Sequence, residues 1–196
     1  DQAIRRAKIG NKSVGVLMLD LDHFKQINDS LGHDVGDAVL KLFAERLRSV
    51  VRSRDTVARL GGDEFAIVVP DLRGEDDLLR LSRSIQERMR APFINAGRML
   101  DCRASLGASV FPAHGNASRE VLKNADVALY AAKAAGRATL MMYRPELRQD
   151  MQRRQAMVQL ARSAIADDRV IPYYQPKLDL QGGTVDGFEA LLRWRM

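Results

Sequence analysis

The sequence contains a single cysteine, Cys102, so no disulfide can form within the chain. It lacks a run of about 18 apolar residues, the length that a membrane-spanning helix needs. Residues 1–12 are polar and charged, which excludes a signal peptide at this position. These absences fit a domain of the reducing cytoplasm, with any membrane anchor lying upstream in a longer parent protein. With 46% hydrophobic residues, the chain has enough apolar material for a packed core.

The charge of the chain is basic but dispersed. It has 31 Lys and Arg against 25 Asp and Glu, a formal net charge of +6. The arginines are mixed with acids along amphipathic helices, and nucleic-acid binding usually needs a clustered basic face. We therefore predict no nucleic-acid partner, and the charge suits a small polyphosphate ligand as well.

Hydrophobic patterning predicts alternating strands and helices. Residues 14–19 form a continuous apolar run typical of a strand buried on both faces, and the chain opens within a helix. Ser118 is expected to cap a helix that stops at Gly136, and Asn95 and Gly97 to form a turn. The remaining predicted helices cover 33–53, 75–90, 118–135 and 145–167, and the strands cover 56–60, 65–69, 93–96, 99–111, 139–143, 170–178 and 184–192.

Acidic residues directly follow the first predicted strand, as Asp20-Leu21-Asp22. We expect the two carboxylates to point to opposite sides, so that at most one of them faces any given site. With the carbonyl of Leu21 as another oxygen ligand, the pattern suits a hard cation such as Mg²⁺ or Ca²⁺. Taken alone, such a tripeptide is more often a solvated loop.

A second acidic pair lies at the tip of a predicted hairpin. Gly61 and Gly62 allow a tight turn whose backbone can approach a ligand closely. Asp63 and Glu64 come next, and they complete a metal site with Asp20 if the two strands are neighbours.

Three separated segments together resemble the GGDEF family of diguanylate cyclase domains. They are residues 22–37 (DHFKQINDSLGHDVGD), 59–65 (RLGGDEF) and 125–137 (ADVALYAAKAAGR). The resemblance covers about residues 1–143 and implies an α+β fold of the nucleotidyl-cyclase, palm-like type, with a mostly antiparallel central sheet flanked by helices. The start of such a domain is missing here, and Ala138 stands where the family commonly has Asn.

The resemblance implies the residues that bind metal and carry the reaction. Asp20, Asp63 and the carbonyl of Leu21 would bind Mg²⁺ or Mn²⁺. Glu64 would help to bind the metal or deprotonate the attacking hydroxyl.

The family also implies a GTP site. Asn28 and Asp37 would recognise guanine, since a carboxylate accepts from its N1 and N2 hydrogens and adenine offers no equivalent. Two segments would hold the phosphates. The first would use the backbone amides near His23 and Phe24 together with Lys25, and the second would use Lys133 and Arg137. Without the family match, Lys133 and Arg137 fit an exposed basic helix end equally well.

The implied reaction joins two GTP molecules into cyclic di-GMP with loss of pyrophosphate. Each domain would hold one GTP, so catalysis requires a homodimer. Arg52 and Asp55 match an Arg-x-x-Asp pattern that forms an inhibitory site for the product in this family, with Arg83 as a further contact; a helix-end salt bridge is the alternative.

The tail shows a second resemblance. Residues 174–177 (YQPK) and 189–194 (EALLRW) look like the opening of an EAL phosphodiesterase domain. Glu189 would be a metal ligand and Arg193 a phosphate contact in a complete domain, but no hydrolysis is expected from this stretch alone. We therefore predict a GGDEF domain over 1–143, a connector helix over 144–168 and an EAL start over 169–196, cut from a tandem parent.

Two other functions stay open at this point. One is a regulatory module that senses GTP or cyclic di-GMP and controls an adjacent EAL domain. The other is an adenylate-type cyclase or polymerase-like palm, which shares the metal chemistry. The presence of both Asp20 and Asp63, together with Glu64, favours the diguanylate cyclase over a pure sensor.

Overall fold

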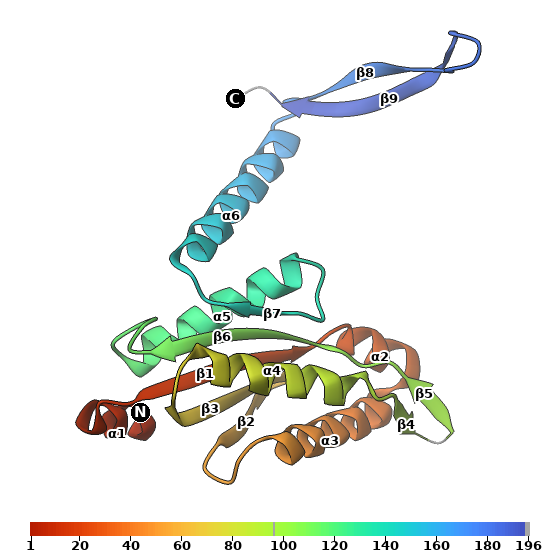
Figure 1. Ribbon diagram of the computed structural model, residues 1–196. Helices are drawn as coiled ribbons and strands as arrows, with labels where there is room; N and C mark the ends of the chain where they lie inside the picture. The colour runs from red at the N-terminus through yellow and green to blue at the C-terminus, as the bar shows by residue number, and fades with distance from the viewer. Residues whose placement is uncertain (96, 195–196) are drawn as a thin grey trace. The chain divides into compact units, whose positions relative to one another are not determined.

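The computed structural model describes residues 1–95 and 97–194 of the chain (Figure 1). The chain divides into two compact units, Asp1–Arg148 and Gln149–Met196. Each unit is described by itself.

A five-stranded sheet forms the centre of the first unit, in the order β2-β3-β1-β6-β7. Strand β1 pairs with β3 on one side and β6 on the other, both antiparallel; β2 pairs antiparallel with β3, and only β7 runs parallel to its neighbour β6. The predicted mostly antiparallel α+β fold is therefore confirmed. The strands are β1 (Ser13–Leu21), β2 (Thr56–Gly61), β3 (Glu64–Leu72), β6 (Ala104–Phe111) and β7 (Leu140–Met142).

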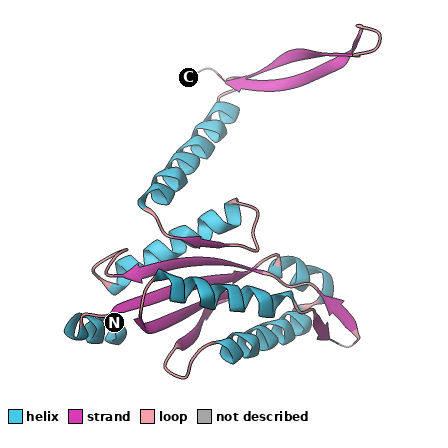
Figure 2. Cartoon of the chain, in the orientation of Figure 1, coloured by secondary structure: helices cyan, strands magenta, loops and turns pink. Residues whose placement is uncertain are grey.

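Helices cover both faces of this sheet (Figure 2). Helices α3 (His33–Val50) and α4 (Glu75–Arg90) pack on one face through Phe43, Leu78 and other buried residues. On the opposite face, α1 (Gln2–Gly10) and α5 (Ser118–Ala134) share a second apolar cluster with β1. Because residues Val14 to Leu21 are buried throughout, β1 is the predicted strand covered on both faces.

Helix α5 lies close to β6 because of a glycine. A Cβ atom at Gly107 would lie 2.1 Å from the backbone nitrogen of Leu129, so any side chain there would push the helix away. This close packing holds the end of α5 next to the end of β1, where the acidic residues lie.

The structure corrects several predicted boundaries. Residues 99–111 are not one strand: β5 (Arg98–Leu100) pairs with β4 (Phe93–Asn95) in a separate ribbon, and β6 starts only at Ala104. Asn95 thus ends β4, Gly97 lies in the turn, and Ala96 lies outside the described residues.

The helix ends also differ in two places. Ser118 is the first residue of α5 rather than its cap, since Ala117 occupies the N-cap position and the Ser118 hydroxyl donates to the side chain of Asp1. Helix α2 (Phe24–Leu31) was not predicted, and Gly32 with φ 88° separates it from α3.

Helix α6 (Pro145–Ala166) begins in the first unit and continues into the second, which ends in the hairpin of β8 (Val170–Leu178) and β9 (Val185–Trp194). Apolar side chains of the hairpin, such as Tyr174 and Phe188, are exposed. Within the described part of the chain, no helix is both long and apolar enough to cross a membrane.

Candidate functional site

The predicted acids converge at the end of β1. Asp20 is the cross-strand partner of Glu64, the first residue of β3. The backbone N–H of Leu21 donates to the carbonyl of Asp63 at 3.3 Å. Sheet pairing therefore brings together two segments more than 40 residues apart in the sequence.

The hairpin turn is shaped by glycine and open to the exterior. Gly62 has φ 49°, a backbone conformation that glycine adopts without strain. A Cβ atom added at Gly61 or Gly62 would meet no other atom within 4 Å. A ligand can thus approach the turn backbone directly beside Asp63.

Asp20 is a buried carboxylate in ionic contact. It is 7% exposed, and one of its oxygens lies 2.6 Å from the ammonium of Lys133 on α5. Burial raises the pKa of Asp20; the ion pair with Lys133 opposes this shift, and the nearby negative charges of Asp63 and Asp22 add to it. A nearby positive charge therefore stabilises the ionised form of Asp20.

This chemistry fits a divalent cation that also contacts a ligand. Within residues 1–95 and 97–194, no three or more His, Cys, Asp and Glu side chains group closely enough to enclose a metal ion. Mg²⁺ is commonly bound by one or two carboxylates, with water and substrate phosphates as its other ligands. The crowded pair Asp20 and Asp63 matches that pattern and does not match a closed structural metal site.

Asp22 was expected to point away from Asp20, and this was wrong. Side chains two residues apart on a strand share one face. One oxygen of Asp22 accepts the hydroxyl of Ser105 at 2.7 Å, and the other accepts the backbone N–H of Ala138 at 2.9 Å, just beyond α5. Asp20 contacts Lys133 near the end of α5, so the two carboxylates face α5 and the segment that directly follows it.

Helix α2 begins directly after these acids. His23 occupies its N-cap with φ 61°, Phe24 is buried, and Lys25 is exposed. The first N–H groups of a helix have no partner within the helix and attract anions. The amides predicted to hold phosphates are thus placed at a helix start beside Asp20.

The predicted guanine-binding residues lie on two adjacent helices. A Cβ atom at Gly36 on α3 would lie 1.9 Å from the side-chain oxygen of Asn28 on α2, so only glycine permits this approach. Asp37, the next residue, is exposed. Asp37 also lines a cavity of about 290 Å³ with Arg59 of the hairpin.

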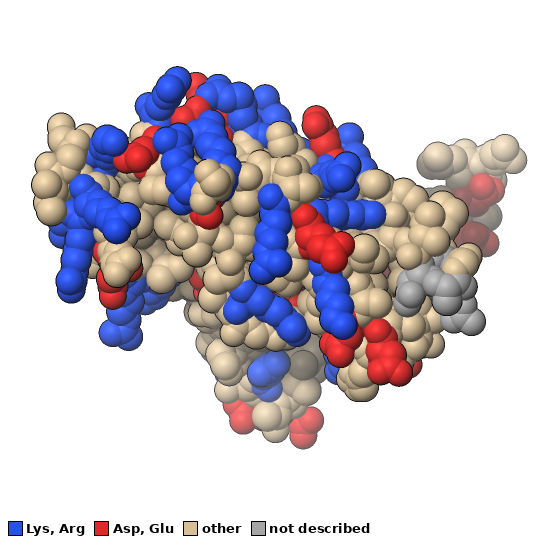
Figure 3. Space-filling view, turned by 90° about the horizontal axis from the view of Figure 1, so that it is seen from below, with Lys and Arg blue, Asp and Glu red and all other residues tan. Residues whose placement is uncertain are grey.

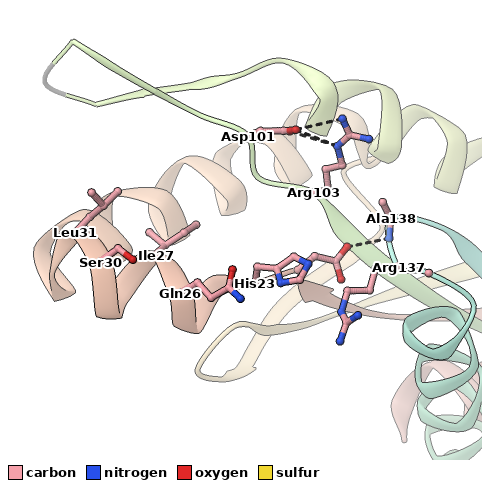
Figure 4. A pocket seen from close by; sticks show the side chains of 11 residues that line it. His23, Gln26, Ile27, Ser30, Leu31, Asp101, Arg103, Arg137 and Ala138 are labelled. Carbon is pink, nitrogen blue, oxygen red and sulfur yellow. Dashed lines mark hydrogen bonds and ion pairs between the residues drawn. The ribbon is translucent and has the colours of Figure 1, made fainter. Parts of the chain in front are cut away.

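A cavity of about 590 Å³ adjoins the N-terminus of α2 (Figure 4). It is lined by His23 at the N-cap of α2, by Gln26 within that helix and by Arg137 after α5. Arg103 lies across from them, paired with Asp101 at 3.2 Å. Sequence reasoning missed Arg103, because a lone arginine before a strand carries no recognisable signal.

A third cavity, of about 180 Å³, lies at the other end of α3. It is lined by Arg52 and Asp55, whose turn is closed by the Arg52 N–H donating to Asp55 at 2.8 Å. The other Asp55 carboxylate oxygen is buried and without a hydrogen-bond partner. Arg80 lines this cavity, whereas Arg83, one turn further along α4, is not among its lining residues.

One face of the molecule shows how its charged side chains are distributed. On the face shown in Figure 3, lysines and arginines are interspersed with acids.

The chain is similar in sequence to a known protein family and to individual members of it. Residues 1–139 match the family model described as diguanylate cyclase, GGDEF domain. Over 194 residues, the chain is 42% identical to the cyclic di-GMP phosphodiesterase NbdA and 36% identical to the bifunctional diguanylate cyclase/cyclic di-GMP phosphodiesterase MucR, both of Pseudomonas aeruginosa. These alignments cover 99% of this chain, but the chain spans only 25% of NbdA and 28% of MucR.

A solved structure shows the same fold. The GGDEF domain of TpbB (YfiN) from Pseudomonas aeruginosa superposes with a TM-score of 0.75 at 36% identity. The superposition covers 77% of this chain and 88% of the other.

Proposed function

The chain belongs to the GGDEF family of diguanylate cyclase domains, and we propose that its site condenses two molecules of GTP into cyclic di-GMP. The observation that carries the proposal is the pairing of Asp20 with Glu64, beside the Asp63 turn, at the start of a helix. A strand-end pair of acids next to free helix amides suits a metal-bound nucleotide triphosphate.

Asp20 and Asp63, with the carbonyl of Leu21 and the carboxylate of Glu64, would hold Mg²⁺ or Mn²⁺. When bound, the metal would stabilise negative charge on the phosphate oxygens. The raised pKa of Asp20, which reflects burial and the nearby acids, supports a role for this residue in binding a cation.

GTP would lie with its base between α2 and α3 and its phosphates at the N-terminus of α2. Asn28 and Asp37 would bind the guanine edge. Lys25, Lys133 and Arg137, with the amides of His23 and Phe24, would hold the phosphates.

The reaction is an attack by the 3′-hydroxyl oxygen of one GTP on the α-phosphorus of the other. A new P–O bond forms, the bond to the β-phosphate oxygen breaks, and pyrophosphate leaves. Glu64 would accept the hydroxyl proton, since it lies beside Asp20 at the turn. The step occurs twice, so two copies of the domain must face each other.

Product inhibition is the second part of the proposal. Arg52 can bind a phosphate or a guanine edge through two parallel hydrogen bonds. The unpartnered oxygen of Asp55 and the presence of Arg80 in the same cavity support a site for the guanine and phosphate groups of cyclic di-GMP. Arg83 remains a predicted contact.

A regulatory role is the alternative function. The relative NbdA is named a phosphodiesterase, and residues 170–194 form a hairpin that carries the EAL-like Glu189 and Arg193. In a tandem protein, the domain would then sense GTP or cyclic di-GMP for a neighbouring EAL domain.

Incubation of the chain with GTP and Mg²⁺, followed by separation of the nucleotides, tests these two functions. A cyclase yields one cyclic di-GMP and two pyrophosphates for every two GTP consumed. Saturable GTP binding without product, at chain concentrations that give dimers, would favour the regulatory role. ATP that competes as well as GTP would contradict the roles of Asn28 and Asp37.

A further inference from the structure

The segment after α5 adopts an unusual backbone conformation. Gly136, Arg137 and Ala138 follow one another with φ values of 112°, 65° and 48°. Residues other than glycine adopt positive φ at an energetic cost, so a pair of them persists only where neighbouring groups hold it.

Two hydrogen bonds hold this segment. The N–H of Arg137 donates to the carbonyl of Ala132 at 3.1 Å, which ties it to α5. The N–H of Ala138 donates to Asp22 at 2.9 Å, which ties it to the end of β1. Asp22 is 7% exposed, and its other oxygen accepts the Ser105 hydroxyl, so its orientation is fixed by β6.

The segment places Arg137 among the residues that line the cavity in Figure 4. Figure 4 shows the bond from Ala138 to the carboxylate, with Arg137 next to it and His23 close by. Asp22, His23 and Arg137 all line the cavity of about 590 Å³ at the start of α2.

We propose that Asp22 is a positioning residue that holds Arg137 where the terminal phosphates of the nucleotide bind. The inference rests on the proposed function, because it requires GTP phosphates at the start of α2. It gives Asp22 a part distinct from that of Asp20: the first acid holds the cation, and the second holds the arginine segment.

Electrostatics and positioning predict opposite effects of removing Asp22. A carboxylate near bound phosphates repels them, so by charge alone a neutral residue strengthens GTP binding. If Asp22 positions Arg137, replacing it with a residue that cannot accept a hydrogen bond from the Ala138 N–H weakens GTP binding instead. The sign of the change therefore separates the two effects.

The test measures binding of GMP and of a GTP analogue with a methylene group between its α- and β-phosphorus atoms, which cannot release pyrophosphate. For D22A, we expect the affinity for the analogue to fall about tenfold, the effect of one charge-assisted hydrogen bond, and the affinity for GMP to stay nearly unchanged. D22N retains an acceptor oxygen and should lose less. S105A removes the hydrogen bond from the Ser105 hydroxyl to Asp22 without changing the charge. It tests the positioning role of Asp22 if D22A does not fold.

D101N is the matched control, because Asp101 lines the same cavity but pairs with Arg103 rather than with the 136–138 segment. It should bind the analogue as well as the unmodified chain or better. In an R137A background, D22A should cause little further loss, since the two residues act as one unit.

The outcomes are distinguishable. If the unmodified chain binds the analogue no better than GMP, the phosphate site itself is wrong, and the proposed function fails together with the inference. If R137A lowers analogue binding while D22A and S105A do not, only the role of Asp22 is overturned. Equal losses for GMP and the analogue in D22A would show a general structural role and would also overturn it.

Discussion

The ammonium of Lys133 lies 2.6 Å from a carboxylate oxygen of Asp20, which links the end of α5 to the end of β1. The proposed mechanism uses both groups: Asp20 for the metal and Lys133 for the phosphates. A cation bound at Asp20 competes with Lys133 for the same carboxylate. Binding of metal and nucleotide is therefore expected to be coupled, with Lys133 moving from the acid to the phosphates.

Asp20→Asn should separate stability from function. Burial raises the pKa of Asp20 despite the ion pair with Lys133, so the charged form is disfavoured in the folded chain, and a neutral residue of the same shape should increase the free energy of unfolding. Thermal unfolding with and without Mg²⁺ and GTP measures this. We expect the ligands to raise the Tm of the unmodified chain and to leave that of D20N unchanged. An equal rise in both would show that Asp20 does not bind the metal.

Ala138→Asn should stabilise the fold. Ala138 has φ 48°, a conformation that costs an alanine about 1 kcal/mol and that asparagine tolerates better. For a chain of this size, that corresponds to a rise in Tm of about 2–4 °C. A134N is the control, because Ala134 is the last residue of α5 and has an ordinary helical backbone conformation; its Tm should not rise. A lower Tm for A138N would show that the segment is not held in this conformation.

His114 should make stability depend on pH. Its Nδ1 accepts the N–H of Val110 at 3.0 Å, and burial lowers the pKa of the imidazole, although the charge of Glu75 opposes that shift. Because the folded-state pKa lies below the ordinary value of about 6.5, the stabilisation is complete above that pH and is lost as the pH falls through the lowered pKa. H114N keeps an acceptor but does not titrate. Its Tm should therefore decline less than that of the unmodified chain between pH 7 and pH 5, and parallel curves would contradict the assignment.

Arg52→Ala should relieve inhibition by cyclic di-GMP without changing GTP affinity. Loss of a bidentate arginine contact is expected to raise the inhibitory concentration about tenfold or more. R54A, in the same turn but not among the residues lining the cavity, is the control. Comparing R80A with R83A then identifies the second arginine: the structure favours Arg80, and the family resemblance favours Arg83. Unchanged inhibition in R52A would mean that the product binds elsewhere.

The sequence was sufficient for the elements whose apolar residues follow a clear period. The buried run of β1 and the amphipathic pattern of α3 appear where they were predicted. Helix α2 was missed because Phe24 is the only buried residue among its eight, so packing against α3 rather than its own pattern stabilises it.

The site was predictable in its residue types and only partly in its geometry. Asp20 and Glu64 were placed together because acids at strand ends and hairpin tips meet when the strands pair. The roles proposed for Asp22 and Arg80 depend on contacts between segments far apart in the sequence. The positive φ of Ala138 was not predictable either, since alanine gives no signal for it.

The most direct test of the account is the rate of cyclic di-GMP formation in a dimeric form of the chain. Two copies can be brought together by fusing a parallel coiled coil to the N-terminus, with Mg²⁺ and GTP supplied in excess. We predict steady formation of cyclic di-GMP by this dimer, and a loss of about 100-fold or more in the same dimer carrying Glu64→Gln. A dimer that binds GTP and Mg²⁺ yet forms no product, or an E64Q dimer that works as fast as the unmodified one, would contradict it.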